Sequence, residues 1–181
     1  PAVGIHPHNE GEESGLSIDE QLKGLDELIA ENREWVVAVG ECGLDFSVTD
    51  TNIRIDANNA NKIPIAEDAH PLTPDEQRKI FLAQIDLAVK HQLPLLLHIN
   101  KAYDEVLDLL NTQYLIHNTA LRAVFHCYTG GKKRIQKIID LGFYFGIGGL
   151  VTYDEGIMQV VREIPLERIL LETDCPFLAP V

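Results

Sequence analysis

The stretch Leu93-Pro94-Leu95-Leu96-Leu97-His98-Ile99 sets the interpretation of this chain, because an unbroken apolar run carries an imidazole near its end. Continuous hydrophobic runs of this length are typical of parallel strands that are covered on both faces. Five further apolar runs have a similar character, and longer amphipathic stretches separate them. The six expected strands cover residues 2–6, 35–40, 93–99, 123–126, 143–147 and 169–172.

The stretches between these runs carry helix signals. The clearest is Thr73-Pro74-Asp75-Glu76, in which Thr73 caps the helix, Pro74 takes the first turn and Glu76 closes a capping box. Apolar spacing extends that helix over residues 74–91. Similar spacing predicts the other helices, at residues 18–31, 102–112, 132–141 and 155–164.

The alternation of strands and helices predicts an α/β protein with a parallel sheet, and two architectures fit it. One is an open doubly wound sheet, and the other is a barrel that lacks units at its ends. No G-x-G-x-x-G pattern follows the first strand, so a dinucleotide-binding fold has no direct support. The polar stretch at about residues 47–72 is too long for an ordinary loop and is expected to be an insertion after a strand end.

Composition narrows the class of protein. The 181 residues include 15 Lys and Arg against 28 Asp and Glu, and the net charge of −13 argues against a broad electrostatic grip on a polyanion. Metal ions bound by clustered carboxylates can nevertheless anchor a phosphate locally. No apolar run approaches the roughly 18 residues that span a bilayer. We therefore expect a cytoplasmic protein, with a nuclear location as the alternative and no membrane partner.

Four of the expected strands lead into a side chain that can bind metal: Glu41, His98, His126 and Asp174. Barrel enzymes place their chemistry at this end of their strands. A single polar residue there is usually structural, but four in one topological position favour a metal site. Imidazoles with carboxylates suit zinc or manganese, and the carboxylate share also admits magnesium.

Three of these side chains are followed at once by cysteine, at Cys42, Cys127 and Cys175. Alternation along a strand turns the residue after an inward ligand toward the helix layer. We therefore expect the three thiols to pack against helices rather than to act in catalysis. Their number and spacing do not fit a disulfide framework or a zinc cluster.

Several strings resemble the signatures of the TatD family of metal-dependent deoxyribonucleases in their order and approximate spacing. The resemblance implies a TIM (β/α)8-type barrel, about six of whose eight β/α units are present. It also implies a centre of two divalent metal ions (Mg, Mn or Zn) that hydrolyses phosphodiester bonds of DNA, often from the 3′ end. The strings are Gly4-Ile5-His6-Pro7-His8, residues 39–46 (VGECGLDF), residues 95–98 (LLLH), residues 125–130 (FHCYTG) and residues 164–180 (IPLERILLETDCPFLAP).

Carried onto this chain, the resemblance implies a role for each candidate residue. Glu41 would bridge the two metals, and His98 and His126 would complete one site. Asp174 would serve the other site and orient or deprotonate the attacking water, which makes Glu41 and Asp174 the expected catalytic residues. His6 would lie near the scissile phosphate, unless it is an ordinary structural histidine at a strand end.

The chain departs from the family pattern in two ways. No D-x-H-x-H strand precedes Pro1 and no eighth strand follows Val181, so we expect one barrel domain over residues 1–181, truncated at both ends, with an incomplete second metal site. Asn100 stands where the family usually has Arg, and Lys101 follows it. Both are expected to bind substrate, but neither can clamp a phosphate through two parallel hydrogen bonds as Arg does.

Two alternatives to a nuclease remain open. One is a related barrel amidohydrolase that acts on a small amide or ester; such sites often use a modified lysine at a strand end, and no expected strand core ends in lysine here. The other is a non-catalytic homologue that keeps the motifs in a truncated chain. The run Lys132-Lys133-Arg134 offers further phosphate contacts, although solvated charges are the commoner meaning of such a run.

Overall fold

A six-stranded parallel sheet forms the centre of the molecule. The computed structural model describes residues 1–8, 15–47, 53–55, 62–64, 72–117, 121–175 and 178–181. The strands of the sheet are β1 (Ala2–Val3), β2 (Ala38–Asp45), β5 (Leu95–Asn100), β6 (Ala123–Phe125), β7 (Tyr144–Ile147) and β8 (Ile169–Leu171). The helices are α1 (Ile18–Glu31), α2 (Pro74–His91), α3 (Tyr103–His117), α4 (Ile135–Asp140) and α5 (Glu155–Val161), with short 3-10 turns η1 (Lys132–Arg134), η2 (Gly149–Thr152) and η3 (Leu166–Arg168).

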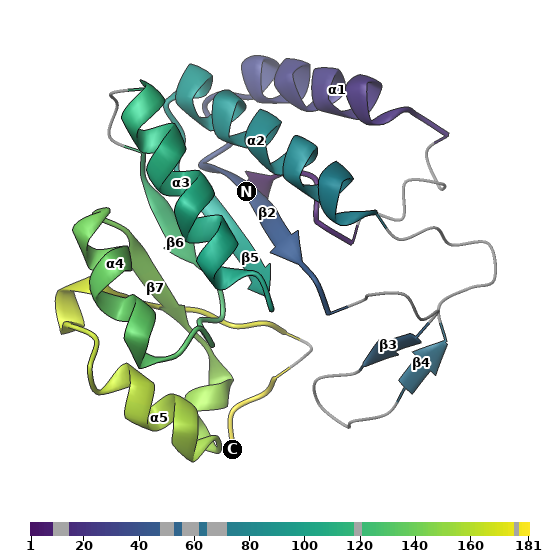
Figure 1. Ribbon diagram of the computed structural model, residues 1–181. Helices are drawn as coiled ribbons and strands as arrows, with labels where there is room; N and C mark the ends of the chain where they lie inside the picture. Colours follow the sequence, from purple (N-terminus) through teal and green to yellow (C-terminus); the bar gives the residue numbers. More distant parts are fainter. Residues whose placement is uncertain (9–14, 48–52, 56–61, 65–71, 118–120, 176–177) are drawn as a thin grey trace.

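The strands lie side by side in chain order, β1-β2-β5-β6-β7-β8, and every neighbouring pair is parallel. A doubly wound sheet would reverse its order at a switch point and carry helices on both faces. Here α1 to α5 follow one another in an arc around the strands (Figure 1). The architecture is that of a partial TIM barrel, as the sequence predicts, and the doubly wound alternative is excluded.

Local sequence signals account for where the two longest N-terminal helices begin. Ser17 and Glu20 form a capping box at the start of α1, and Thr73 and Glu76 form another at the start of α2, with Pro74 in the first turn. The predicted bounds of both helices are confirmed. Among the described residues, no helix is both long and apolar enough to cross a bilayer.

Strand bounds differ from expectation at the N-terminal side of the sheet. β1 ends at Val3 rather than His6, because the backbone groups of Ile5 pair with a side chain of α2 instead of a strand. β2 continues past Gly40 to Asp45 and pairs with β5 from Val39 to Asp45, with one irregularity. The segment that carries Glu41 is therefore a strand interior rather than a loop.

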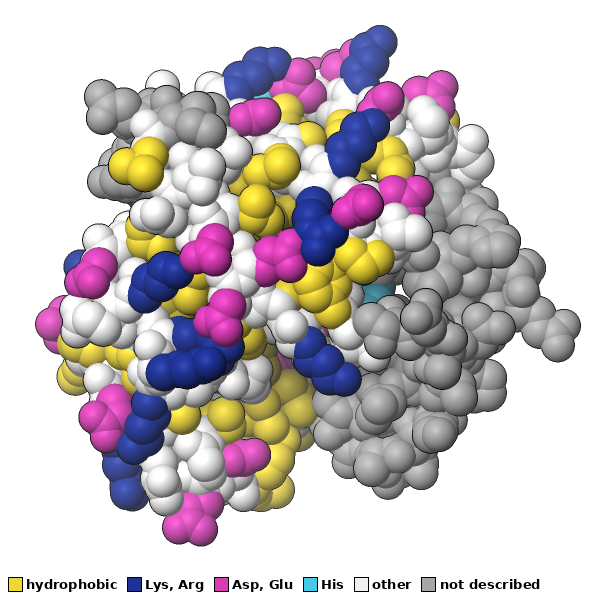
Figure 2. All heavy atoms as spheres, in the orientation of Figure 1, with side chains coloured by type: hydrophobic (Ala, Val, Ile, Leu, Met, Phe, Trp, Pro, Cys, Tyr) yellow, Lys and Arg dark blue, Asp and Glu magenta, His cyan; other side chains and the backbone are white. Residues whose placement is uncertain are grey.

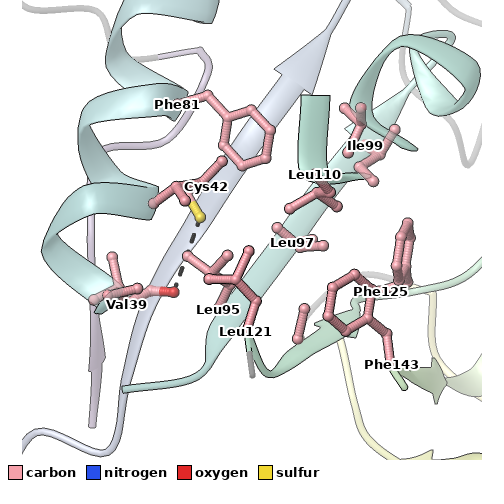
Figure 3. Close-up of a cluster of buried hydrophobic side chains, with 14 of the residues drawn as sticks. Val39, Cys42, Phe81, Leu95, Leu97, Ile99, Leu110, Leu121, Phe125 and Phe143 are labelled. Carbon is pink, nitrogen blue, oxygen red and sulfur yellow. Dashed lines mark hydrogen bonds between the residues drawn. The ribbon is translucent and has the colours of Figure 1, made fainter. Parts of the chain in front are cut away.

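The core lies between the sheet and the helices. Cys42 is fully buried there, beside Phe81 of α2 and Leu95 of β5 (Figure 3), which confirms the expected packing of this thiol. The same expectation is wrong for Cys175, which is exposed because β8 ends four residues earlier. Cys127 is half-buried, just beyond the end of β6.

Part of the polar stretch at residues 47–72 forms an antiparallel pair of short strands, β3 (Ile53–Ile55) and β4 (Lys62–Pro64). Figure 1 shows this pair beyond the carboxyl end of β2. The sequence does not predict it, because three residues are too few to show a strand period. Residues 48–52, 56–61 and 65–71 lie outside the described residues, and the single-domain organisation with an insertion here stays a prediction.

Candidate metal centre

Glu41 lies at an irregularity in β2. Gly40 pairs with Leu96 and Cys42 pairs with Leu97, so Glu41 has no partner in the register of β5. An extra residue of this kind is a β-bulge, which re-aims one side chain without ending the strand. The Glu41 side chain is 40% exposed and therefore accessible to solvent.

One group of metal-capable atoms forms around this bulge. One ligand atom from each of His6, Glu41 and His98 lies within 4.8 Å of the others. The His6 Nε2 and Glu41 Oε2 atoms are 3.8 Å apart, and the rings of His6 and His98 meet edge to face at 4.3 Å between centroids. A carboxylate and two imidazoles thus meet at one place. Glu41 comes from β2, His98 from β5, and His6 from the segment that follows β1.

Asp45, four residues further along β2, anchors the adjacent side of this group. Its carboxylate is 2% exposed and its Oδ2 lies 2.6 Å from His8 Nε2 and 3.0 Å from His98 Nε2. Burial alone would raise the pKa of Asp45, but its hydrogen bonds with His8, His98 and Ser47 outweigh burial and hold the pKa well below its usual range. Asp45 is therefore a fixed anion that orients two imidazoles.

Space at this position is limited. A Cβ atom on Gly43, midway between Glu41 and Asp45, would collide with the backbone carbonyl of His98, and its φ of 144° is one that L side chains rarely adopt. Glycine at position 43 therefore lets the β2 backbone approach the β5 backbone closely at His98.

A second group forms where β6 and β8 end. Glu172 accepts a hydrogen bond from His126 Nδ1 at 3.0 Å and another from the backbone N–H of Cys127. The opposite ring atom, His126 Nε2, lies 3.4 Å from Asp174 Oδ1. Glu172 raises the pKa of His126 to about 9, opposed by burial and assisted by the charges of Glu41 and Asp174. His126 is thus an imidazole among three carboxylates.

The influence of Glu41 on His126 links the two groups. The carboxylate at the β2 bulge contributes to the raised pKa of an imidazole that follows β6. Glu41 therefore groups with His6 and His98 and also acts electrostatically on His126, which pairs with Asp174. Of the residues expected to bind metal, the structure places Glu41 with His98, and His126 with Asp174.

The donor chemistry fits divalent cations. Carboxylate oxygens and neutral imidazole nitrogens are ligands for zinc and manganese, and the carboxylates also suit magnesium. The carboxylates of Glu172 and Asp174 contact His126, and the charge of Glu41 also acts on it, so negative charges outnumber this one imidazole. A bound cation would offset the surplus. This surplus is the feature of the structure that supports a metal at the site.

The sequence patterns assign no role to His8, Asp45 or Glu172. Their contacts arise between segments 37 to 53 residues apart, for example His126 with Glu172 and His98 with Asp45. The one local signal is the spacing of Glu41, Gly43 and Asp45, which alternate along the same strand.

The expected substrate-binding residues Asn100 and Lys101 lie at the end of β5, on the wall of a cavity of about 480 Å³. Phe46, Thr129 and Arg134 line the same cavity. Within the part of the chain that the structure describes, neither the Asn100 nor the Lys101 side chain has a hydrogen bond or ion pair. Lys101 adopts a φ of 55°, a left-handed value that is uncommon for residues other than glycine.

A partial TIM barrel with carboxylates and imidazoles at the carboxyl ends of its strands has the architecture of the barrel metallohydrolases. Comparison with known proteins agrees and narrows the class. The chain belongs to the TatD related DNase family, whose family model matches residues 1–181.

Individual relatives support this membership. The chain is 34% identical over 182 residues to the 3′-5′ ssDNA/RNA exonuclease TatD of Salmonella typhimurium, and the match covers 98% of this chain and 58% of the relative. It is 39% identical to the protein of that name from Erwinia billingiae, over 98% and 58% of the two chains. The uncharacterized metal-dependent hydrolase YabD of Bacillus subtilis is 33% identical, over 99% and 59%. The chain thus spans rather less than two thirds of these relatives.

Solved structures give the same result for the fold. The crystal structure of YJJV, a TatD homologue from Escherichia coli K12, superposes with a TM-score of 0.75 at 27% identity, over 99% of this chain and 59% of that one. A TatD-family hydrolase from Entamoeba histolytica superposes with a TM-score of 0.71 at 24% identity, over 98% and 50%, and shows the shared fold alone.

Proposed function

We propose that the protein is a divalent-metal-dependent deoxyribonuclease that hydrolyses single-stranded DNA from the 3′ end, with two metal ions at the carboxyl edge of the barrel sheet. The position of Glu41 carries the proposal, because its carboxylate lies with His6 and His98 and its charge also acts on His126. Family membership supports the reaction class. The names of the relatives from Salmonella typhimurium and Erwinia billingiae support the substrate and the direction.

Different residues of the site would bind the metals, accept the proton and orient His126. Glu41, His98, His126 and Asp174 would hold the cations, which polarise phosphate oxygens and lower the pKa of water. Asp174 is 37% exposed, so its carboxylate is accessible to an attacking water and can accept the proton that the water loses. Glu172 keeps the His126 ring in place through Nδ1 while Nε2 faces Asp174.

Substrate contacts would come from His6, Asn100 and Lys101. His6 belongs to the metal-capable group with Glu41 and His98 and is about one-third exposed, so it could contact a phosphate oxygen beside a cation held there. Asn100 and Lys101 follow His98 along the chain and open onto the cavity described above. Lys101 offers a cation without a competing ion pair among the described residues, which makes it a point contact for the phosphodiester backbone.

The face of the molecule drawn in Figure 2 supports a local mode of nucleic-acid binding. Figure 2 shows Lys and Arg side chains interspersed with Asp and Glu over the visible face. Many of these charges pair between elements, as Lys79 does with Asp19 and Lys137 with Asp108. Paired charges give a polyanion little to bind, so the nucleic acid would depend on the metal edge for its affinity.

A cleavage assay with end-labelled oligonucleotides tests the proposal. Single-stranded DNA that carries a label at the 5′ end should shorten one nucleotide at a time with Mg²⁺ or Mn²⁺, and EDTA should stop the reaction. Glu41→Gln removes a charged metal ligand and Asp174→Asn removes the proton acceptor, so each should lower kcat by at least about a hundredfold. Glu31→Gln, at the exposed end of α1, makes a similar change of charge outside the site and should leave kcat unchanged.

Other outcomes contradict the proposal in distinct ways. Cleavage of RNA alone would correct the substrate, and loss of nucleotides from the 5′ end would correct the direction. Hydrolysis of a cyclic amide such as dihydrouracil, with intact DNA, would identify an amidohydrolase. A folded protein that binds no Mn²⁺ and cleaves neither substrate would be a non-catalytic homologue.

A further inference from the structure

Helix α2 directs two buried glutamines toward the segments that carry the metal-capable residues. Gln77 is 4% exposed and Gln84 is fully buried. Seven residues separate them, so they lie on the same helix face, about 10 Å apart along the axis. Burying an amide costs free energy unless each polar atom finds a hydrogen-bond partner, so the partners of these two side chains are informative.

The Gln84 side chain makes the two backbone hydrogen bonds that a neighbouring strand would otherwise make with Ile5. Its Oε1 accepts a hydrogen bond from the Ile5 backbone N–H at 2.7 Å, and its Nε2 donates to the Ile5 carbonyl at 2.9 Å. His6 is the next residue. A Cβ atom on Gly4 would lie 2.8 Å from Gln84 Oε1, so glycine at this position is needed for the amide to sit where it does.

Gln77 makes the matching contact at the other end. Its Oε1 accepts from the Asp45 backbone N–H at 2.9 Å, and its Nε2 donates to the carbonyls of Asp45 at 3.0 Å and Leu72 at 3.2 Å. The Asp45 carboxylate in turn holds His98 and His8. Gln84 therefore fixes the backbone of Ile5, which precedes His6 in the chain. Gln77 fixes the backbone of Asp45, whose carboxylate contacts His98.

We propose that Gln77 and Gln84 are positioning residues that set His6 and His98 against Glu41, acting as a two-point amide clamp from α2. The inference rests on the proposed metal-dependent function and assigns the clamp a task within it. β2 alone cannot set this geometry, because Glu41 sits on a bulge and β1 stops at Val3. Helix α2 therefore holds the backbones of Ile5 and Asp45 through hydrogen bonds that the strand pairing of the sheet does not supply.

Metal affinity measured on folded variants tests the clamp. Gln84→Met and Gln77→Met keep length and volume but leave the backbone groups of Ile5 or Asp45 without the amide. Each should weaken Mn²⁺ binding, measured by calorimetry, about 10- to 100-fold, as loss of an outer partner of a metal ligand does. In the cleavage assay the same variants should lower kcat with little change in KM. The matched control is Ile85→Ala, which truncates another fully buried side chain of the same helix but leaves both glutamine amides in place.

Amide hydrogen exchange provides a second measurement that needs neither metal nor activity. Gln84→Met should accelerate exchange at the Ile5 amide, and Gln77→Met at the Asp45 amide, with little change at Val39 in the centre of the sheet. If a methionine variant does not fold, Gln84→Asn keeps an amide on α2 but shortens the side chain by one methylene, so it cannot make both hydrogen bonds to Ile5 at their present distances, and it should weaken Mn²⁺ binding as well.

Two results overturn the clamp: Mn²⁺ affinities of the folded glutamine variants within twofold of the wild type, or an equal loss in Ile85→Ala. Failure of the proposed function has a different signature. A wild-type protein that binds Mn²⁺ but leaves nucleic acid intact refutes the nuclease, while the variant affinities and amide exchange still decide whether the clamp exists.

Discussion

Replacing Glu172 by glutamine removes one charge and keeps the shape of the side chain. The carboxylate, 18% exposed, accepts hydrogen bonds from His126 Nδ1 and from the Cys127 N–H, one on each oxygen. An amide has one acceptor oxygen, so its NH₂ group must face one of these two donors. One charge-assisted hydrogen bond is lost, and the His126 ring is no longer fixed from both sides.

The expected size of the effect follows from that single contact. A hydrogen bond to a charged group contributes about 1.5–3 kcal/mol. Each 1.4 kcal/mol is about a tenfold change in an equilibrium constant, so Glu172→Gln should weaken binding of Mn²⁺ by about 10- to 100-fold if the ring must be held to bind. Calorimetric titration measures the dissociation constant, and a thermal melt shows that the variant is folded.

Glu167→Gln is the matched control, because it makes the same change of charge in η3 on an exposed side chain. It should shift the dissociation constant less than twofold. If Glu172→Gln is folded and binds Mn²⁺ as the wild type does, Glu172 does not position His126 for metal binding. If both variants weaken binding equally, the effect comes from net charge rather than from the hydrogen bond.

Three further predictions concern the fold. Phe81→Ala should lower the free energy of unfolding by about 3–5 kcal/mol in urea titrations, since the ring is fully buried; a loss under 1 kcal/mol would mean that the site collapses around the gap. The hydrogen bond from Lys90 lowers the pKa of Asp26, so this pair should stabilise the fold by about 1 kcal/mol above pH 4 and lose that contribution as pH falls further; Asp26→Asn should therefore approach wild-type stability in acid, and a constant difference would refute the linkage. Burial raises the pKa of Cys42 to about 12, so a thiol reagent at pH 8 should modify exposed Cys175 and leave Cys42 intact until the protein unfolds; early modification of Cys42 would show that the core opens.

Local signals made most of the fold predictable. A capping residue, a proline in the first turn and an apolar spacing all act within about two helical turns, so α1 and α2 begin and end where the sequence indicates. The apolar runs likewise locate every strand of the main sheet. The exact ends of β1 and β2 were not predictable, because Ile5 and Asp45 bind glutamine side chains 79 and 32 residues away.

The site was predictable in part for the same reason. A polar residue at a strand end can be recognised in the sequence, and Glu41, His98 and His126 were singled out in this way. The partners that orient them could not be recognised so readily. Asp45 looks like any carboxylate until the fold shows that it is buried between two imidazoles, and no local pattern shows that it will be.

The order of the strands also bears on how the edge is assembled during synthesis. Each strand of the main sheet hydrogen-bonds the one made before it, so every newly added unit meets a neighbour that is already present. Side chains capable of binding a cation accumulate one unit at a time, and Asp174 arrives last among those considered. A nascent chain that stops at β7 would carry His6, Glu41, His98 and His126 but neither Glu172 nor Asp174, so the His126–Asp174 side of the edge should be completed last in the maturation of the protein.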